Sequence, residues 1–325
     1  MTEFPCLGHT GLANLGNTCY INTAIQCLCN YPTIVSILKV VKMRMNKNKN
    51  KNNQVEFVME LCDLIELIET HNATIVPKRF ISKLQNLMNN SSCELESVNT
   101  QNDCSELILL IFDTIHKVTK SEINQKSMKK YNKSLTNFFN STFQNDYSIL
   151  YDKTIMITEN SMMDDDNKCR NTYYESNIYM SLHMNNMTPG MKIEKMIEQY
   201  FNGDTIDGWK DDKTNTYHNV NVSKKIIKQP ENLFVHLKRF TNNMKKIQKT
   251  ITYGEILDLT EFSVKPCKYQ LQSLVMHTGS VFGGHYYCIR RLGDRWLEYN
   301  DTNVYEISLE KVPSSYVYCL CYTKM

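Results

Sequence analysis

Cys-x-x-Cys pairs are absent from this sequence, although it has twelve cysteines in 325 residues. The closest cysteines are Cys27 with Cys29 and Cys319 with Cys321. Zinc knuckles and thioredoxin-like redox sites are built on Cys-x-x-Cys spacing, so both kinds of site are disfavoured. A length of 325 residues with 42% hydrophobic residues also excludes a small module held together by disulfides.

Three further features are missing. Residues 1–10 contain no basic stretch leading into an apolar one, so they do not resemble a secretory signal. The longest strongly apolar run, 107–112, is too short to cross a bilayer. The 37 basic and 34 acidic residues nearly balance, which argues against nucleic acid or an anionic membrane as the main partner. We therefore expect a soluble protein of the cytoplasm or nucleus with reduced thiols.

Helical signals dominate the first 120 residues, and no internal repeat is present. Apolar residues at 21, 24, 25 and 28 predict a helix capped by Asn17 or Thr18 and closed by Pro32. A second helix is predicted to begin at Asp103, with Glu106 completing a capping-box-like pair. The polar tract 46–53 between them predicts a mobile surface loop.

The later part of the chain changes character. Residues 141–230 have the least regular pattern, apart from a short helix predicted at 193–200. From Leu233 onward, aromatic and β-branched runs predict strands at 233–237, 271–276, 286–290, 296–299 and 316–322. Helices followed by an antiparallel sheet indicate an α+β fold.

Cys19 is the candidate nucleophile. The segment from Gly11 to Asn22 predicts a glycine-containing loop that delivers this thiol to the first turn of a helix. Free backbone N–H groups and the helix dipole favour negative charge at that position, and a thiolate is the nucleophilic form of cysteine. The alternative is that Cys19 is a small buried apolar residue.

His285 is the candidate base, because it lies in a predicted β-hairpin with an amide and a carboxylate on the second strand. A two-residue turn at Leu292 and Gly293 would pair His285 directly with Asn300. Asn300 would then orient the imidazole, and Asp301 would point to the opposite face unless a bulge exchanges the two. Cysteine, histidine and an amide or carboxylate form the nucleophile, base and orienter of thiol proteases.

Four motifs in order carry a resemblance to the ubiquitin-specific proteases. The segment 11–22 resembles the cysteine box of that family, and 269–301 resembles its histidine box. Between them, 101–107 and 235–240 are similar to other family signatures, and the strand at 316–322 fits the family's ending.

The resemblance implies a papain-like cysteine protease with a helical thumb, an antiparallel β palm and a fingers subregion that grips ubiquitin. One catalytic domain would span 8–325, with the thumb at about 10–140, the fingers at about 141–230 and the palm at about 231–325. Cys19 would attack the carbonyl of the bond after the last glycine of ubiquitin, and His285 would take and return the proton. Asn14 and the N–H of Cys19 would stabilise the oxyanion.

Three other residues are candidate substrate contacts. Gly283 and Gly284 leave the channel beside His285 without side chains, which suits a substrate tail ending in two glycines, although a plain turn explains them as well. Asp103 is either only the cap of its helix or, as the resemblance implies, also a partner for the basic tail of ubiquitin.

The fingers depart from the family, whose members often hold a structural zinc there on two Cys-x-x-Cys pairs. The matching positions lie near Asp166 and Cys169 and near Asp211 and Thr214, and only Cys169 is a cysteine. One thiolate among scattered carboxylates is not a tetrahedral site, and His183 and His218 are better explained as surface residues. We therefore expect no zinc, with apolar packing of Ile155, Ile157, Tyr179 and Leu182 as a substitute.

The sequence thus predicts a cysteine-type deubiquitinase that needs no cofactor, acts as a monomer on ubiquitin and ubiquitinated proteins, and has no flanking targeting domain. Two alternatives remain: a catalytically weak or silent ubiquitin-binding adaptor, and a protease for another ubiquitin-like modifier.

Overall fold

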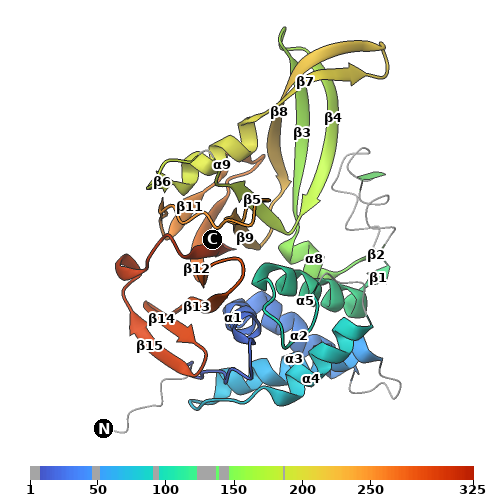
Figure 1. Ribbon diagram of the computed structural model, residues 1–325. Coiled ribbons are helices and arrows are strands. Elements are labelled where there is room, and N and C mark those ends of the chain that lie inside the picture. Colours follow the sequence, from blue (N-terminus) through green and yellow to red (C-terminus); the bar gives the residue numbers. More distant parts are fainter. Residues whose placement is uncertain (1–7, 46–51, 91–94, 123–136, 139–145, 186) are drawn as a thin grey trace.

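The computed structural model has three parts: a group of helices, an eight-stranded sheet, and a four-stranded sheet that projects away from both (Figure 1). It describes residues 8–45, 52–90, 95–122, 137–138, 146–185 and 187–325. Most of the polar tract 46–53 lies outside these residues. Helices followed by a mainly antiparallel sheet confirm the predicted α+β class.

The helical part matches the predicted helices with one correction. It consists of α1 (Cys19–Leu28), α2 (Pro32–Met45), α3 (Asn53–Thr70), α4 (Lys78–Asn89) and α5 (Cys104–Thr119), followed by α8 (Ile149–Thr154). Asp103 caps α5 as predicted, accepting hydrogen bonds from the backbone N–H groups of Ser105 and Glu106. Pro32 does not close α1 but begins α2, because proline lacks the N–H that the first helical turn leaves unpaired. In the described part of the chain, no single helix is long and apolar enough to cross a membrane.

The eight-stranded sheet carries the histidine side of the candidate site. Its strand order is β15-β14-β13-β12-β16-β9-β5, with β11 also paired to β12. β5 runs parallel to β9, and the other neighbours in this sheet are antiparallel. The bounds are β5 (Tyr179–His183), β9 (Asn232–Lys238), β11 (Ile256–Asp258), β12 (Lys268–Gly279), β13 (Gly284–Leu292), β14 (Arg295–Asn300), β15 (Asn303–Ile307) and β16 (Val317–Lys324).

Both faces of this sheet are buried. On one face, α1 and the other helices pack against residues such as Phe234, Val275 and Tyr286. On the other face, α9 (Ile193–Asn202) and the loops beyond it cover a second apolar cluster that includes Val235 and Leu274. The residues of β16 from Val317 to Tyr322 are therefore all buried, although the sequence shows an alternating pattern there. Because the sheet is packed on both faces, α1, and with it Cys19, is held against the strand that carries His285.

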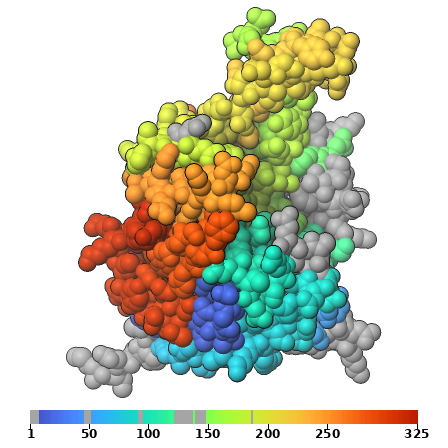
Figure 2. All heavy atoms as spheres, viewed as in Figure 1, coloured from blue at the N-terminus to red at the C-terminus, as the bar shows by residue number. Residues whose placement is uncertain are grey.

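The four-stranded sheet occupies the part of the sequence expected to be least regular, and that expectation was wrong. Its order is β4-β3-β8-β7, all antiparallel, and it stands out from the body in Figure 2. The bounds are β3 (Met156–Asp164), β4 (Cys169–Asn177), β7 (Asp204–Asp211) and β8 (Thr216–Lys228). Because most of β4 and β7 is at least partly exposed, these strands lack the apolar alternation that signals a strand in a sequence.

Apolar packing within the projecting sheet is limited. Ile155 and Ile157 form a small cluster near its base, and Met162, Val220 and Val222 form another further out. Tyr179 and Leu182, which we expected to hold these strands, lie instead in β5 of the eight-stranded sheet. Short paired strands complete the fold: β1 (Ser121–Glu122) with β2 (Asp146–Tyr147), and β6 (Met191–Lys192) with β10 (Ile251–Thr252).

Candidate active site

Cys19 is the first residue of α1, and it is 5% exposed. The hydroxyl of Thr18, the residue before it, turns back into the preceding loop instead of capping the helix. It accepts from the N–H of Leu15 and donates to Oδ1 of Asn14. The first-turn N–H groups of α1 therefore receive no bond from this side chain, which suits a site that must stabilise negative charge.

Asn14 has a fixed amide orientation. Its Oδ1 accepts from the backbone N–H groups of Gly16 and Thr18, at 3.0 and 3.2 Å. Its Nδ2 donates to Oδ2 of Asp301 at 2.9 Å. Since an amide nitrogen carries two protons, one N–H of Asn14 is left to donate to another acceptor.

His285 is the second residue of β13, and its Nε2 lies 2.7 Å from Oδ1 of Asn300 at the end of β14. The predicted hairpin register was wrong: the turn lies one residue later than expected, so each residue of β13 pairs two residues further along β14. The turn is Gly293 and Asp294, so Leu292 pairs with Arg295. Asn300 therefore lies diagonally across from His285. It stays on the same face of the sheet, because a displacement of two residues leaves each side chain on its predicted face.

Asp301 turns away from His285. It begins the two-residue turn between β14 and β15 in a left-handed conformation with φ of 52°. Its Oδ1 accepts from Nδ2 of Asn22 at 2.8 Å, its Oδ2 accepts from Asn14, and its backbone oxygen accepts from the N–H of Leu12. Asp301 thus joins the Cys19 loop and α1 to the turn that follows Asn300.

The close approach behind these contacts requires Gly11. A Cβ atom on Gly11 would lie 2.5 Å from the backbone oxygen of Thr302 and 2.8 Å from that of Asp301. The segment before Cys19 therefore passes directly over the catalytic-side turn, with no room for a side chain.

His285 is electrostatically coupled to the thiol. Hydrogen bonding with Cys19 is the main cause that raises the pKa of His285 to about 9, with a smaller contribution from Asn300, while partial burial opposes both. Near neutral pH the imidazole is then held as an imidazolium beside the sulfur.

The predicted substrate-contact residues differ in their surroundings. Gly284 donates its N–H to Oε1 of Gln101, which ties the loop before His285 to the helical part. Gly283 has open space around it. Asp103 is already engaged, because it caps α5 and its Oδ2 accepts from the hydroxyls of Tyr286 and Tyr318.

Asn22 and Gln101 belong to this site, yet the sequence analysis assigned them no role. Asn22 is 2% exposed and follows Cys19 by three residues, so helical spacing places both on one face of α1. That spacing is a usable signal for Asn22. Gln101 gives no local signal, because its partner is 183 residues away.

The tip of the projecting sheet does not fit a structural zinc. Oδ2 of Asp164 forms an ion pair with Nε of Arg170 at 2.6 Å, and its Oδ1 accepts backbone N–H groups of the adjoining turn. Oδ1 of Asp211 accepts from the N–H of Lys213, and Arg170 helps lower the pKa of Asp211. Within the described ranges, no three His, Cys, Asp or Glu side chains come together to hold a metal. An arginine lies where the family pattern would place zinc ligands.

A thiol at a helix start, facing a histidine that an amide holds in place, defines the site of a cysteine hydrolase. The chain belongs to the ubiquitin carboxyl-terminal hydrolase family, because the family profile matches residues 10–322.

Curated relatives agree with this assignment. Ubiquitin carboxyl-terminal hydrolase 10 of Saccharomyces cerevisiae is 26% identical over 393 residues, covering 99% of this chain and 48% of the relative. Ubiquitin carboxyl-terminal hydrolase 2 of Homo sapiens is 26% identical over 348 residues, covering 99% of this chain and 56% of the relative. The chain thus spans about half the length of these two relatives.

A solved structure supports the fold. The SAGA Ubp8/Sgf11/Sus1/Sgf73 DUB module bound to ubiquitin aldehyde matches with a TM-score of 0.76 at 19% identity, covering 100% of this chain and 72% of that chain. At this identity the likeness establishes the fold alone.

Proposed function

We propose that this protein is a deubiquitinating thiol protease that hydrolyses the peptide or isopeptide bond after the C-terminal glycine of ubiquitin. The observation that carries the proposal is the arrangement of Cys19 at the start of α1 with His285, whose Nε2 is held by Asn300. The names of the relatives, and the ubiquitin aldehyde bound by the related DUB module, supply the substrate class.

In this mechanism, His285 holds the proton of the Cys19 thiol, and the sulfur attacks the carbonyl carbon of the last glycine of ubiquitin. The remaining N–H of Asn14 and the backbone N–H of Cys19 donate to the oxyanion, and each such donor typically contributes about 3 kcal/mol. His285 then gives its proton to the leaving amine. Water hydrolyses the resulting thioester, with His285 acting again as the base.

The remaining assignments are part of the same proposal. Gly283 and Gly284 line the channel for the glycine tail of ubiquitin, and Asp103 borders it. Residues 8–325 act as one catalytic domain and as a monomer, which light scattering on the purified chain tests. A catalytic thiol requires a reducing compartment, so we place the protein in the cytoplasm or nucleus.

A covalent probe tests the activity directly. The protein is incubated with ubiquitin carrying a C-terminal electrophile, and intact mass is measured for the parent and for Cys19→Ala. We expect one ubiquitin adduct on the parent and none on the variant. Absence of an adduct on the parent would refute the activity, and an adduct on the variant would assign the nucleophile to another cysteine. Parallel probes built on other ubiquitin-like modifiers determine whether ubiquitin is the preferred modifier.

A further inference from the structure

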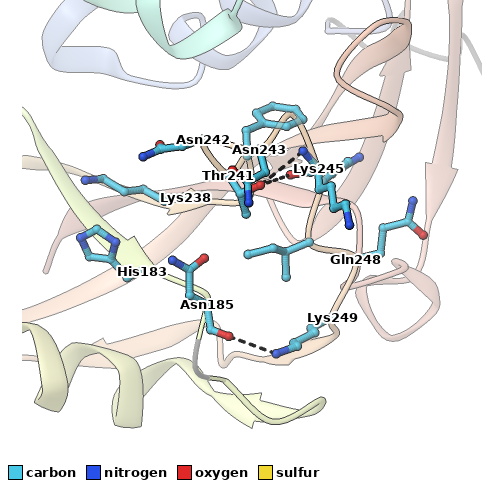
Figure 3. Close-up of a pocket in the computed structure, with 12 residues that line it drawn as sticks. His183, Asn185, Lys238, Thr241, Asn242, Asn243, Lys245, Gln248 and Lys249 are labelled. Atoms are coloured by element: carbon cyan, nitrogen blue, oxygen red, sulfur yellow. Dashed lines mark hydrogen bonds between the residues drawn. The ribbon is translucent and has the colours of Figure 1, made fainter.

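A hollow of about 860 Å³ lies beside the eight-stranded sheet, and its lining includes none of the candidate active-site residues. We call it the palm-loop pocket. It is lined by the ends of β5 and β9 and by the loop 241–249, and Figure 3 shows the side chains arranged around it. Its lysines are Lys238, Lys245, Lys246 and Lys249, and His183 also lines it, with a pKa that partial burial and Lys238 lower. Within the described part of the chain, no aspartate or glutamate lines it.

The lysines of this pocket differ from those elsewhere on the surface. Many other lysines pair with a carboxylate, as Lys39 does with Glu69. In the neighbouring hollow, which shares His183 and Lys238, Lys224 pairs with Asp204. Among the described residues, none of the four pocket lysines forms an ion pair. Lys246 and Lys249 donate only to backbone carbonyls, those of His277 for Lys246 and of Asn185 and Met187 for Lys249.

A buried arginine, which does not itself line the pocket, holds the pocket loop in place. Arg239 is 0% exposed, and its guanidinium donates to four backbone carbonyls, two of which, Ile247 and Lys249, lie in or at the end of the loop. The loop also closes on itself through the bridge between Phe240 and Lys246. The loop that lines the pocket is therefore preformed, and the guanidinium that holds it is paired with backbone carbonyls only.

The charges in and beside the pocket repel one another. Partial burial, together with the charge of Arg239, lowers the pKa of Lys246 to about 8. Amide groups of Asn185, Asn242 and Gln248 add hydrogen-bond donors to the lining. A bound anion would offset the repulsion and use these donors.

We propose that the palm-loop pocket binds a compact anion that carries several phosphate groups. Lysine ammonium groups bind phosphate, and the volume lies in the usual range for small-ligand sites. Each phosphate group supplies up to about two negative charges at pH 7, which matches several ammonium groups around one hollow. In an extended acidic peptide, carboxylates on the same face are about 7 Å apart. Such a peptide therefore brings fewer negative charges near the clustered lysines than a compound with adjacent phosphate groups.

Calorimetry tests the proposal with sodium tripolyphosphate as the probe, at neutral pH and about 0.15 M salt, where exposed charges are screened within about 8 Å. The full chain is used with Cys19→Ala as the background, so the result does not depend on the proposed hydrolase activity. We expect saturable binding of one equivalent. The double variant Lys238→Gln/Lys245→Gln should weaken it by about tenfold or more; both residues are exposed, so folding is preserved.

The matched control is Lys265→Gln/Lys311→Gln, which removes the same charge from exposed positions outside the pocket and should change affinity by less than about twofold. Three results would overturn the proposal: no saturable binding, equal weakening in both double variants, or tighter binding of hexaglutamate than of tripolyphosphate. The last would assign the pocket to an acidic protein segment instead.

Discussion

Asn300 and Asp301 are adjacent in the sequence, but they hold different parts of the site. The extended end of β14 directs Asn300 to His285, whereas the left-handed backbone at Asp301 directs its carboxylate to Asn14 and Asn22. One residue thus orients the base, and the next orients a proposed oxyanion donor and anchors α1.

Substituting each residue separates these roles. Asn300→Ala should lower kcat by about tenfold or more, because the imidazole loses its orienting acceptor, and should leave stability within about 0.5 kcal/mol. Asp301→Ala should lower kcat less, but it should destabilise the protein by about 2 kcal/mol, since buried Asn22 loses a charged acceptor. Steady-state hydrolysis of a fluorogenic ubiquitin substrate and urea unfolding measure both effects. A larger kcat loss in Asp301→Ala would contradict the assignment of Asn300 as the orienter.

The titration of His285 reports its contact with Cys19. NMR of the imidazole should give a pKa of about 9 in the parent, and a clearly lower one in Cys19→Ala, because the main cause of the raised pKa is removed while partial burial remains. Since the folded-state pKa is raised from 6.5, this group stabilises the fold fully below about pH 6.5, and the contribution is lost as pH rises towards about 9. The free energy of unfolding should therefore fall more steeply over that window in the parent than in the variant. Identical titrations in both proteins would contradict the contact.

At the scale of elements, the loop between β12 and β13 contains two adjacent glycines in different surroundings. A Cβ on Gly284 would lie 2.2 Å from Nε2 of His277 and 2.6 Å from the oxygen of Thr278, whereas Gly283 has nothing within 4 Å. Gly284→Ala should therefore destabilise the hairpin by more than about 1 kcal/mol and reduce activity.

Gly283→Ala is the matched control and also tests the substrate channel. Its stability in urea should equal that of the parent, while KM for a ubiquitin substrate rises with a smaller change in kcat. Unchanged KM would place the glycine tail of ubiquitin elsewhere.

At the tip of the projecting sheet, Arg170 forms an ion pair with Asp164, and we expect this pair to stabilise the tip. Arg170→Met should leave the carboxylates of Asp164 and Asp211 without their cation, so amide hydrogen exchange should accelerate at the β3–β4 and β7–β8 turns. Arg79→Met, which removes an arginine that is 80% exposed from a surface ion pair, is the control and should leave those turns unchanged. Equal exchange at the tip in both variants would refute the role of Arg170, and one equivalent of zinc in undialysed protein would refute the absence of a metal.

At the scale of the whole molecule, Phe234 connects the helices to the sheet. It is fully buried in β9, and its ring packs against those of Tyr31, Phe112 and Tyr179, which come from the α1–α2 connection, α5 and β5. The two sides of the active site are held in register through this shared core.

Phe234→Ala should destabilise the protein by about 3–5 kcal/mol, the usual range for a fully buried phenylalanine, as measured by urea unfolding. Activity of the remaining folded fraction should also fall, because α1 and β13 share this core. Phe282→Ala is the control: that side chain is 80% exposed, so its removal should leave the unfolding free energy nearly unchanged. A cost below about 1 kcal/mol for Phe234→Ala would show that the two parts fold independently of this contact.

Features that depend on short stretches of chain could be predicted from the sequence alone. These are the helix that starts at Cys19, the cap at Asp103, the short helix near 193–200, and the later strands. Each has a local physical signal, such as a helical period, a capping side chain or a run of β-branched and aromatic residues.

Contacts between residues far apart in the chain became visible only in the folded structure. The pairing of β13 with β14 differs from the prediction by two residues, and this even difference keeps Asn300 on the face of His285. Only the fold showed that Asp301 reaches Asn14 and Asn22. The projecting strands are stabilised mainly by backbone pairing with little burial of side chains. Their sequences therefore lack the alternating apolar residues that predict a strand. The approach of Arg170 in β4 to Asp211 in β7 likewise depends on strands that are far apart in the sequence, because their relative position follows from strand pairing.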